Sequence, residues 1–282
     1  MRWQKGRRSG NVIDRRGSPR RRKAAGGGLG LLAIAVVAML FGVDPRLVLE
    51  IGSQLDSGPV QQSAPRSAEE DRLAEFVQVI LADTEDTWHE LFRQRGQQYK
   101  EPKLVLFSGS TRSACGFAQS AMGPFYCPGD QQVYIDLGFY NELKNRFGAP
   151  GDFAQAYVIA HEVGHHVQTL LGISAQVQKA KSRASTVEAN AIQVRMELQA
   201  DCLSGVWANH AHEARNLLEK GDIEEGLTAA AAIGDDTLQR KTQGHVVPES
   251  FTHGSAKQRQ KWFSRGFKSG DMANCDTFSG NV

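Results

Sequence analysis

Two short stretches decide the fold, HEVGHH at residues 161–166 and MELQAD at residues 196–201. The first matches the pattern H-E-x-x-H and the second contains E-x-x-x-D. Residues four apart on an α-helix lie about 40° apart around its axis, so the rings of His161 and His165 can converge on one metal ion. The spacing therefore predicts a helix that presents two imidazole ligands on one face, with His166 pointing away.

The residues that flank HEVGHH predict where this helix begins and ends. Asp152 followed by Gln155 is a capping-box-like start, and residues 153–171 contain no proline. Gly172 stands where a left-handed C-cap is expected. Both histidines are therefore expected at mid-helix, where the backbone is rigid.

Glu197 is the predicted third metal ligand. Catalytic zinc is usually bound by three protein side chains and keeps a fourth position for water. Glu197 lies in a second predicted helix, roughly residues 187–212, and Asp201 falls on the same face one turn later. The Asp201 carboxylate can accept a hydrogen bond from a zinc histidine and fix its tautomer. Glu162 is rotated off the ligand face, so it can reach the metal-bound water and not the metal.

The alternative to a metal site is a surface helix with solvated histidines and an ordinary exposed glutamate. A bare H-E-x-x-H can arise by chance. Here it falls inside a predicted capped helix, and an acidic pair with i,i+4 spacing follows on another helix. We therefore favour the metal site.

The composition indicates a globular body with unevenly distributed charge. The chain has 282 residues, 40 % of them hydrophobic, which suffices for one domain of about 200 residues plus attachments. Residues 1–23 carry 10 Lys or Arg against one acid, which leaves 23 basic and 30 acidic residues elsewhere. The body is mildly acidic, so no nucleic-acid-binding face is expected on it.

Residues 24–43 form an uncharged run, AAGGGLGLLAIAVVAMLFGV, long enough to cross a bilayer as a helix of about 30 Å. We predict a single transmembrane helix, with residues 1–23 as a basic cytoplasmic tail and the C-terminal body outside the membrane, in the periplasm or at the cell exterior. A cleaved signal peptide is the main rival, disfavoured because no small-x-small site follows Val43, and a buried core helix is another. The tail could instead bind nucleic acid, but a topogenic role explains both its charge and its position.

Residues 44–67 are predicted to be a flexible tether, because they contain three prolines and show no sustained periodicity after Ile51. The folded domain is predicted to cover residues 68–282. Its first element is an amphipathic helix, whose apolar residues recur at three- and four-residue spacing from Leu73 to Phe92.

A small antiparallel sheet is predicted from residues 103–107 and 132–136, which flank a segment rich in Gly, Ser and Pro. Its exposed edge either binds a peptide in extended form or is purely structural, and the sequence does not decide between the two. Further helices are expected from 222 to about 242 and over 255–267. The fold class is therefore α+β and mostly helical.

The four cysteines contain no C-x-x-C pair, which disfavours a thiolate zinc site. Disulfides are expected if the domain lies outside the membrane. Of the three possible pairings we favour Cys115–Cys127, closing the Gly-rich loop, with Cys202–Cys275, tying the C-terminal segment to the helix of Glu197. Free buried thiols are the alternative.

His253 lies just ahead of the last predicted helix, on a loop. From there it could project as a catalytic hydrogen-bond donor to a transition state. The alternative is a histidine that merely packs.

With these residues assembled, the chain resembles the bacterial neutral zinc metallopeptidase family, single-pass proteins with an extracytoplasmic zincin-like domain. The resemblance rests on segments within residues 2–17, 113–116, 133–140, 161–168, 197–207 and 252–255. It implies a gluzincin-type site with one Zn²⁺ on His161, His165 and Glu197. Glu162 would be the base, and Asp201 would support a zinc histidine.

The pattern and the resemblance together predict a membrane-anchored zinc metalloendopeptidase, a hydrolase of peptide or protein substrates. Glu162 would take a proton from the zinc-bound water and pass it to the leaving amine, and zinc, with His253, would stabilise the oxyanion. One alternative is a membrane-tethered binding or scaffold protein with a structural metal, which has no need of Glu162. Another is a metal-dependent hydrolase of a non-peptide amide.

Overall fold

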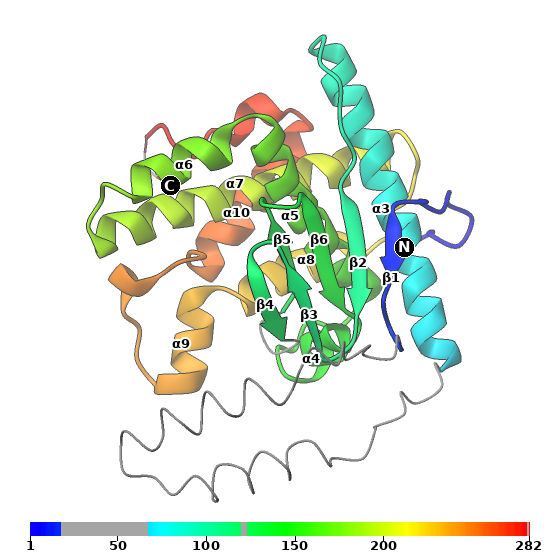
Figure 1. Ribbon diagram of the computed structural model, residues 1–282, viewed down its shortest axis with the longest axis horizontal. Helices are drawn as coiled ribbons and strands as arrows, with labels where there is room; N and C mark the ends of the chain where they lie inside the picture. Colours follow the sequence, from blue (N-terminus) through cyan, green and yellow to red (C-terminus); the bar gives the residue numbers. More distant parts are fainter. Residues whose placement is uncertain (18–66, 120–122, 281) are drawn as a thin grey trace, which may run out of the picture. The chain divides into compact units, whose positions relative to one another are not determined.

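The structure, a computed structural model, describes residues 1–17, 67–119, 123–280 and 282. Its main sheet has the strand order β1 (Val12–Asp14), β2 (Lys103–Phe107), β6 (Gln132–Asp136) and β5 (Phe125–Cys127), and a separate hairpin pairs β3 (Ser110–Ser113) with β4 (Gly116–Gln119). The α-helices are α3 (Ala68–Gln94), α4 (Gly138–Asn145), α5 (Asp152–Leu170), α6 (Ile173–Lys181), α7 (Thr186–Glu213), α8 (Asp222–Ala232), α9 (Asp235–Gln243) and α10 (Ala256–Ser269). Two short 3₁₀ helices, η2 (Pro248–Ser250) and η3 (Met272–Cys275), lie near the C-terminus. In Figure 1 the strands stand side by side, with α3 beside β1 and with α6, α7 and α10 beyond β5.

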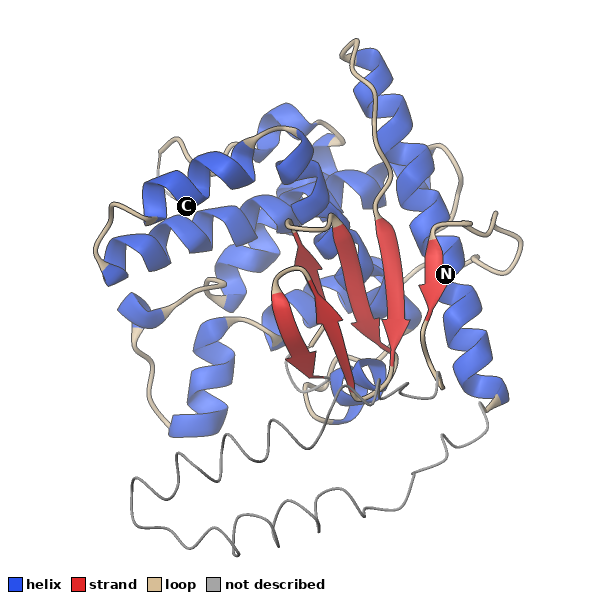
Figure 2. Ribbon diagram, in the orientation of Figure 1, coloured by secondary structure: helices blue, strands red, loops and turns tan. Residues whose placement is uncertain are grey.

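The main sheet is mixed, so the predicted antiparallel sheet is wrong. β1, β2 and β6 run parallel, and only β5 is antiparallel to its neighbour β6. Residues 108–131 connect β2 to β6, and they carry the hairpin and β5. Parallel strands need such a long connection, whereas two antiparallel strands can be joined by a tight turn. The α+β class and the mostly helical character are as expected (Figure 2).

Strand β2 is buried on both faces. Leu104 and Leu106 belong to the main hydrophobic core, whereas Val105 and Phe107 pack with Tyr134 in a smaller cluster. Side chains alternate between the two faces of a strand, so this division follows from the period of two. Burial on both faces is typical of parallel strands.

The N-terminal segment is part of the folded body and not a separate tail. Residues 1–16 and 67–282 form one compact unit. β1 pairs with β2 in the register Val12 to Leu104, and the buried Trp3 ring packs edge-on against Phe76 at 5.3 Å between ring centroids. A single membrane crossing between these two parts would put strands of one sheet on opposite sides of a bilayer. The predicted cytoplasmic tail, residues 1–23, is therefore wrong for residues 1–16.

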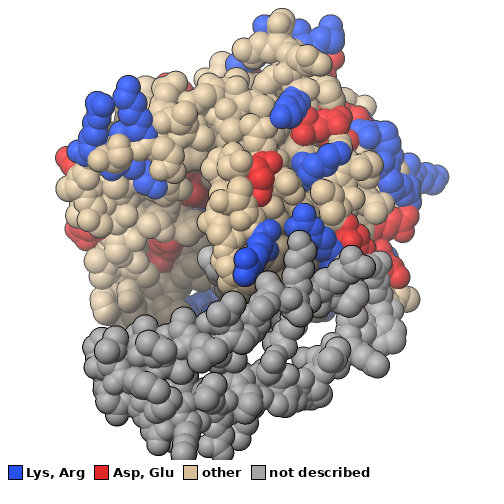
Figure 3. Space-filling view, in the orientation of Figure 1, with Lys and Arg blue, Asp and Glu red and all other residues tan. Residues whose placement is uncertain are grey.

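Several basic side chains of this segment are paired with carboxylates of helix α3. Arg7 Nη2 lies 2.9 Å from Glu85 and 2.8 Å from Asp86, and Arg8 pairs with Glu75. Figure 3 shows the result, with Lys and Arg side chains interspersed among Asp and Glu where α3 and the N-terminal segment lie. Part of the basic charge that predicted a topogenic role, that of Arg7 and Arg8, is therefore paired within the fold.

No helix within residues 1–17, 67–119 and 123–280 is both long enough and apolar enough to cross a membrane. The predicted transmembrane helix, residues 24–43, and almost all of the predicted tether fall outside the described residues. The predicted fold class included a transmembrane helix, and the predicted localisation was a single-pass membrane protein. Both predictions are wrong by this finding and by the pairing of β1 with β2 in one sheet.

Helix α5 carries HEVGHH, and its two ends test the flank prediction. Gly172, just past the helix, has φ 76°, so the predicted left-handed C-cap is confirmed. The predicted capping box is wrong, because the N-cap is Gly151, which has no side chain, and the Phe153 N–H donates instead to the Glu225 carboxylate of α8 at 3.0 Å. The carboxylate of Asp152 accepts hydrogen bonds of 3.1 and 3.2 Å from the Met1 amine instead.

The predicted helix from residue 222 to about 242 is two helices, α8 and α9. The chain breaks at Ile233 and Gly234, and the Asp235 N–H then donates to the Gly254 carbonyl at 2.9 Å. This contact comes from a loop distant in sequence, which helical periodicity does not reveal. The last helix, α10, is predicted correctly, with Ser255 and Gln258 forming a capping box.

Close packing and disulfides bring the remaining helices together. A Cβ on Gly266 of α10 would lie 1.9 Å from the Cys202 carbonyl of α7, so this crossing tolerates only glycine. Both predicted disulfides, Cys115–Cys127 and Cys202–Cys275, are confirmed. The second joins α7 to η3.

Candidate metal centre

The predicted ligands come together between α5 and α7. The Nε2 atoms of His161 and His165 lie 3.2 and 3.4 Å from the same oxygen, Oε2 of Glu197. Zinc–ligand bonds of about 2.0–2.1 Å in a tetrahedron separate neighbouring ligand atoms by about 3.3 Å. The three side chains, which are buried or nearly so, thus fit one zinc ion.

A glycine inside the motif allows α5 and α7 to approach this closely. A Cβ on Gly164 would lie 3.1 Å from the Ala200 carbonyl and 3.3 Å from its Cα. These distances are tighter than ordinary van der Waals contacts, so a larger residue would push α7 away from α5. Gly164 therefore helps to bring Glu197 within reach of both rings.

Asp201, the predicted support of a zinc histidine, lies against the His161 ring, with Oδ1 2.9 Å from Nδ1. Arg259 of α10 donates two hydrogen bonds of 2.9 Å to the same carboxylate, and the Tyr157 hydroxyl donates another. Burial opposes ionisation of Asp201, but Arg259 and His161 outweigh it and lower its pKa to about 2. The carboxylate is therefore ionised and fully hydrogen-bonded.

The electrostatic field of the centre favours a cation. Burial lowers the pKa of His161, but Asp201 and Glu197 outweigh that effect and raise it to about 10. Burial raises the pKa of Glu197, but His165 and His161 bring it well below its ordinary value. Glu197 is therefore ionised, and positive charge at Nε2 of His161 is stabilised, whether a proton or a metal ion carries it.

Glu197 offers one oxygen to a metal because the other is occupied. Gln193, one helical turn earlier, donates from Nε2 to Glu197 Oε1 at 2.7 Å. Lys181 of α6 donates to Gln193 Oε1 at 2.6 Å. A lysine only donates, so it fixes the orientation of the Gln193 amide and directs the amide N–H toward Glu197.

Glu162 is available for chemistry. It follows His161 on α5, it is 8 % exposed, and its carboxylate has no hydrogen-bond partner in the described part of the chain. A carboxylate with free acceptor oxygens, beside two histidines that could hold a metal ion, can accept a proton from water. Its position is that of the predicted base.

His166 points away from the centre, as its position on the helix predicts. Its Nε2 lies 2.6 Å from the Lys100 carbonyl, and its Nδ1 lies 3.1 Å from the Tyr126 hydroxyl of β5. A carbonyl only accepts, so Nε2 carries the proton and Nδ1 accepts from Tyr126. Burial lowers the pKa of His166 to about 4, and the neutral ring ties α5 to the edge strand β5.

His253 is not brought to the centre by any contact within the described residues. Its ring is half-exposed, and its Nδ1 lies 3.2 Å from Asp235 and 3.1 Å from the Thr252 hydroxyl. Its backbone N–H also donates to Asp235, at 2.6 Å. These contacts fix the loop ahead of α10, and they lend no support to a catalytic role.

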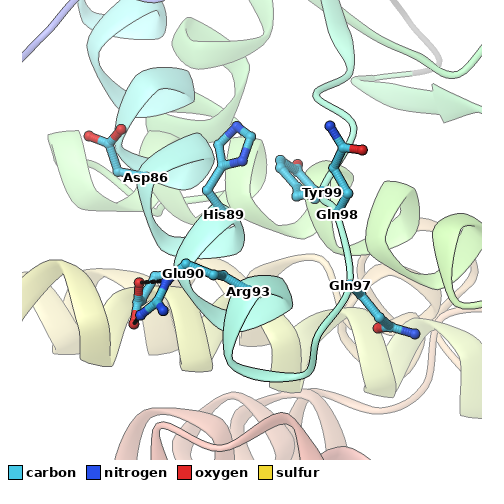
Figure 4. A pocket seen from close by; sticks show the side chains of 7 residues that line it. All are labelled: Asp86, His89, Glu90, Arg93, Gln97, Gln98 and Tyr99. Carbon is cyan, nitrogen blue, oxygen red and sulfur yellow. Dashed lines mark hydrogen bonds and ion pairs between the residues drawn. The ribbon is translucent and has the colours of Figure 1, made fainter.

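Besides the metal centre, a second cluster of carboxylates and a surface hollow could bind a ligand. Asp152, Asp222 and Glu225 also have carboxylates close enough for a metal, but the Met1 amine lies 3.1 Å from Asp152 and 3.5 Å from Asp222. A surface hollow of about 440 Å³ beside α3, drawn in Figure 4, is lined by Asp86, His89, Glu90, Arg93, Gln97, Gln98 and Tyr99. His89 also pairs with Glu101 at 2.9 Å. None of these residues belongs to the metal centre.

Sequence reasoning missed several supporting residues. Gln193 could have been found, because it lies four residues before Glu197 on one helix. Gln168, three residues after His165, could have been found in the same way. Arg259 could not, because the α7–α10 packing that brings it to Asp201 joins residues far apart in the sequence.

Comparison with known proteins identifies relatives along the whole chain. A family model described as "Putative neutral zinc metallopeptidase" matches residues 1–278, which confirms the expected family. "Uncharacterized protein YpfJ" of Escherichia coli (strain K12) is 52 % identical over an alignment of 294 residues that covers 100 % of both chains. "Uncharacterized protein Rv2575" of Mycobacterium tuberculosis (strain ATCC 25618 / H37Rv) is 42 % identical over 257 residues, 86 % of this chain and 85 % of that one. No solved structure matches the chain.

Proposed function

The chain belongs to the neutral zinc metallopeptidase family, and we propose that it hydrolyses peptide bonds with one Zn²⁺ held by His161, His165 and Glu197. The observation that carries the proposal is the position of Glu197 Oε2, 3.2 and 3.4 Å from the two Nε2 atoms. These separations suit a tetrahedral ion with one vertex left for water or substrate.

Zinc, when bound there, supplies Lewis acidity that lowers the pKa of water towards about 7 and polarises the scissile carbonyl. Glu162 accepts the proton of the attacking water on its carboxylate and later delivers it to the leaving amine. Its lack of a hydrogen-bond partner within the described residues supports this role, because a carboxylate already engaged in an ion pair would be a weaker base.

The residues behind the ligands fix which ring nitrogen of His161 and which oxygen of Glu197 face the ion. His161 donates its Nδ1 proton to Asp201, so the lone pair of Nε2 is directed to the ion. Gln193 holds Glu197 Oε1 at 2.7 Å, which leaves Oε2 for the ion. The ligands are therefore preorganised, and little reorganisation accompanies binding.

Glu162→Gln tests the proposal, because it removes the base and keeps the size of the side chain. We expect one zinc per chain, as in the wild type, and a loss of peptide hydrolysis of roughly 10²–10⁴-fold. His161→Ala should lose both zinc and hydrolysis. Zinc is measured by mass spectrometry of metals, and cleavage is followed on an unbiased peptide library.

The matched control is Glu224→Gln, on the exposed side of α8, which should change neither quantity. Wild-type zinc binding without any Glu162-dependent cleavage would contradict the proposal. That outcome would favour a structural metal in a binding protein, or hydrolysis of a non-peptide amide.

A further inference from the structure

We propose that Gln168 and Gln199 form an amide relay that positions His165 and connects it to the Cys202–Cys275 disulfide. The inference rests on the proposed zinc site and adds to it a support for the second histidine. Gln168 and Gln199 would be positioning residues, since neither touches the metal position.

The relay is a continuous chain of hydrogen bonds. His165 Nδ1 lies 2.9 Å from Gln168 Oε1. Gln168 Nε2 donates to Gln199 Oε1 at 3.0 Å and to the Met196 carbonyl at 2.8 Å. Gln199 Nε2 donates to the Cys275 carbonyl at 3.0 Å.

The far end of the relay determines the direction of every hydrogen bond in it. A backbone carbonyl can only accept, so Gln199 must turn its NH₂ group to Cys275 and its oxygen to Gln168. Gln168 must then donate, and its own oxygen faces His165. His165 therefore carries its proton on Nδ1, and the lone pair of Nε2 is left for the metal.

Burial makes the relay hard to replace. Gln168 is fully buried and Gln199 is 7 % exposed, so water has little access to an amide that loses its partner. A buried donor or acceptor that loses its partner is destabilised, because water cannot replace the lost hydrogen bond. Loss of one link is therefore expected to loosen the next link and, through it, the ring.

The disulfide anchors the far end of the relay to α7. Cys202 lies three residues after Gln199 on α7, and Cys275 supplies the terminal carbonyl from η3. Beyond it, the Thr277 hydroxyl donates to the Arg195 carbonyl at 2.6 Å. The segment therefore stays attached to α7 without the disulfide, but the position of the Cys275 carbonyl is less well fixed.

Affinity for Zn²⁺ alone, by competition with a chelator, tests the relay without any measurement of hydrolysis. Gln168→Met should weaken zinc binding about 10–100-fold, as is usual for residues that support a metal ligand. Gln199→Met should weaken it about 10-fold, equivalent to about 1.4 kcal/mol. The absorption spectrum of bound Co²⁺ should change in Gln168→Met, because the ring of His165 is reoriented.

A combination of variants distinguishes the relay from general destabilisation. Cys202→Ser with Cys275→Ser should weaken zinc binding about as much as Gln199→Met, and adding Gln199→Met should cause no further loss. The matched control, Cys115→Ser with Cys127→Ser, removes the other disulfide and should leave zinc affinity unchanged.

Zinc affinity of Gln168→Met within twofold of the wild type, or additive losses in the combined variant, would overturn the relay and leave the zinc site intact. A wild-type protein that binds no zinc would overturn the proposed function, and the relay with it.

Discussion

His161 and His165 are one helical turn apart and are proposed to do the same task, yet they are supported in different ways. The His161 ring donates to a charged group, Asp201, which is neutralised by the buried guanidinium of Arg259. The His165 ring donates to a neutral amide, Gln168, which continues to a backbone carbonyl through a second amide. Both arrangements place the proton on Nδ1.

The difference lies in what happens when one partner is lost. A buried ion pair that loses one member leaves an uncompensated charge, and this costs about 3–5 kcal/mol. A neutral amide that loses a partner leaves an unsatisfied dipole, and this costs about 1–3 kcal/mol. The charged support should therefore dominate the stability of the fold, whereas the neutral one should matter mainly for the metal.

Arg259→Met gives the largest expected effect. It leaves the buried carboxylate of Asp201 without its counter-ion, so the free energy of unfolding should fall by about 3–5 kcal/mol in urea titrations. Lys257→Met, on the exposed face of the same helix, is the control and should change it by less than about 0.5 kcal/mol. A loss below about 1 kcal/mol for Arg259→Met would mean that the two supports do not differ as described.

The third ring of the motif, His166, sharpens the comparison because it is held neutral by burial, with no carboxylate among its hydrogen-bond partners. Its pKa is lowered from 6.5 to about 4, so as pH falls the unfolded chain binds the proton before the folded one does. The contribution of the neutral His166 ring to the free energy of unfolding should be fully present above about pH 6.5. It should fall by about 3 kcal/mol as pH approaches 4. The difference in unfolding free energy between wild type and His166→Gln, measured from pH 7 to 4.5, isolates this effect. Identical pH dependence in the two proteins would refute it.

Tyr157→Phe should give the smallest of these effects. The Tyr157 hydroxyl donates to Asp201, so its removal should lower the free energy of unfolding by about 1.5–3 kcal/mol, at the lower end because Arg259 and His161 remain in place. Tyr140→Phe is the control, since the buried Tyr140 hydroxyl has no partner among the residues described, and its loss should be neutral or stabilising. Equal losses of unfolding free energy in the two variants would show that the hydrogen bond to Asp201 does not stabilise the fold.

The parts of the site that the sequence predicted are the ones encoded locally. The spacing of His161 and His165, the Asp201 position relative to Glu197 and the left-handed Gly172 all lie within single helices or at their ends. Helical geometry determines these relations almost independently of the rest of the chain.

The parts that the sequence did not predict depend on contacts between distant segments. β1 pairs with β2 about 90 residues later, so the charge of the N-terminal segment alone predicts a tail. The direction of β2 relative to β6, the break at Ile233 and the arrival of Arg259 at Asp201 have the same origin. Charge and hydrophobic periodicity predict the structure of a segment, but they do not predict which distant segment packs against it.

The central claim is that His161, His165 and Glu197 hold one zinc ion, and anomalous scattering at the zinc edge from crystals grown with Zn²⁺ tests it most directly. The account predicts one strong peak, bonded to Nε2 of both histidines and to Oε2 of Glu197 at about 2.0–2.2 Å. A peak confined to Asp152, Asp222 and Glu225, or no peak beside Glu197, would contradict it.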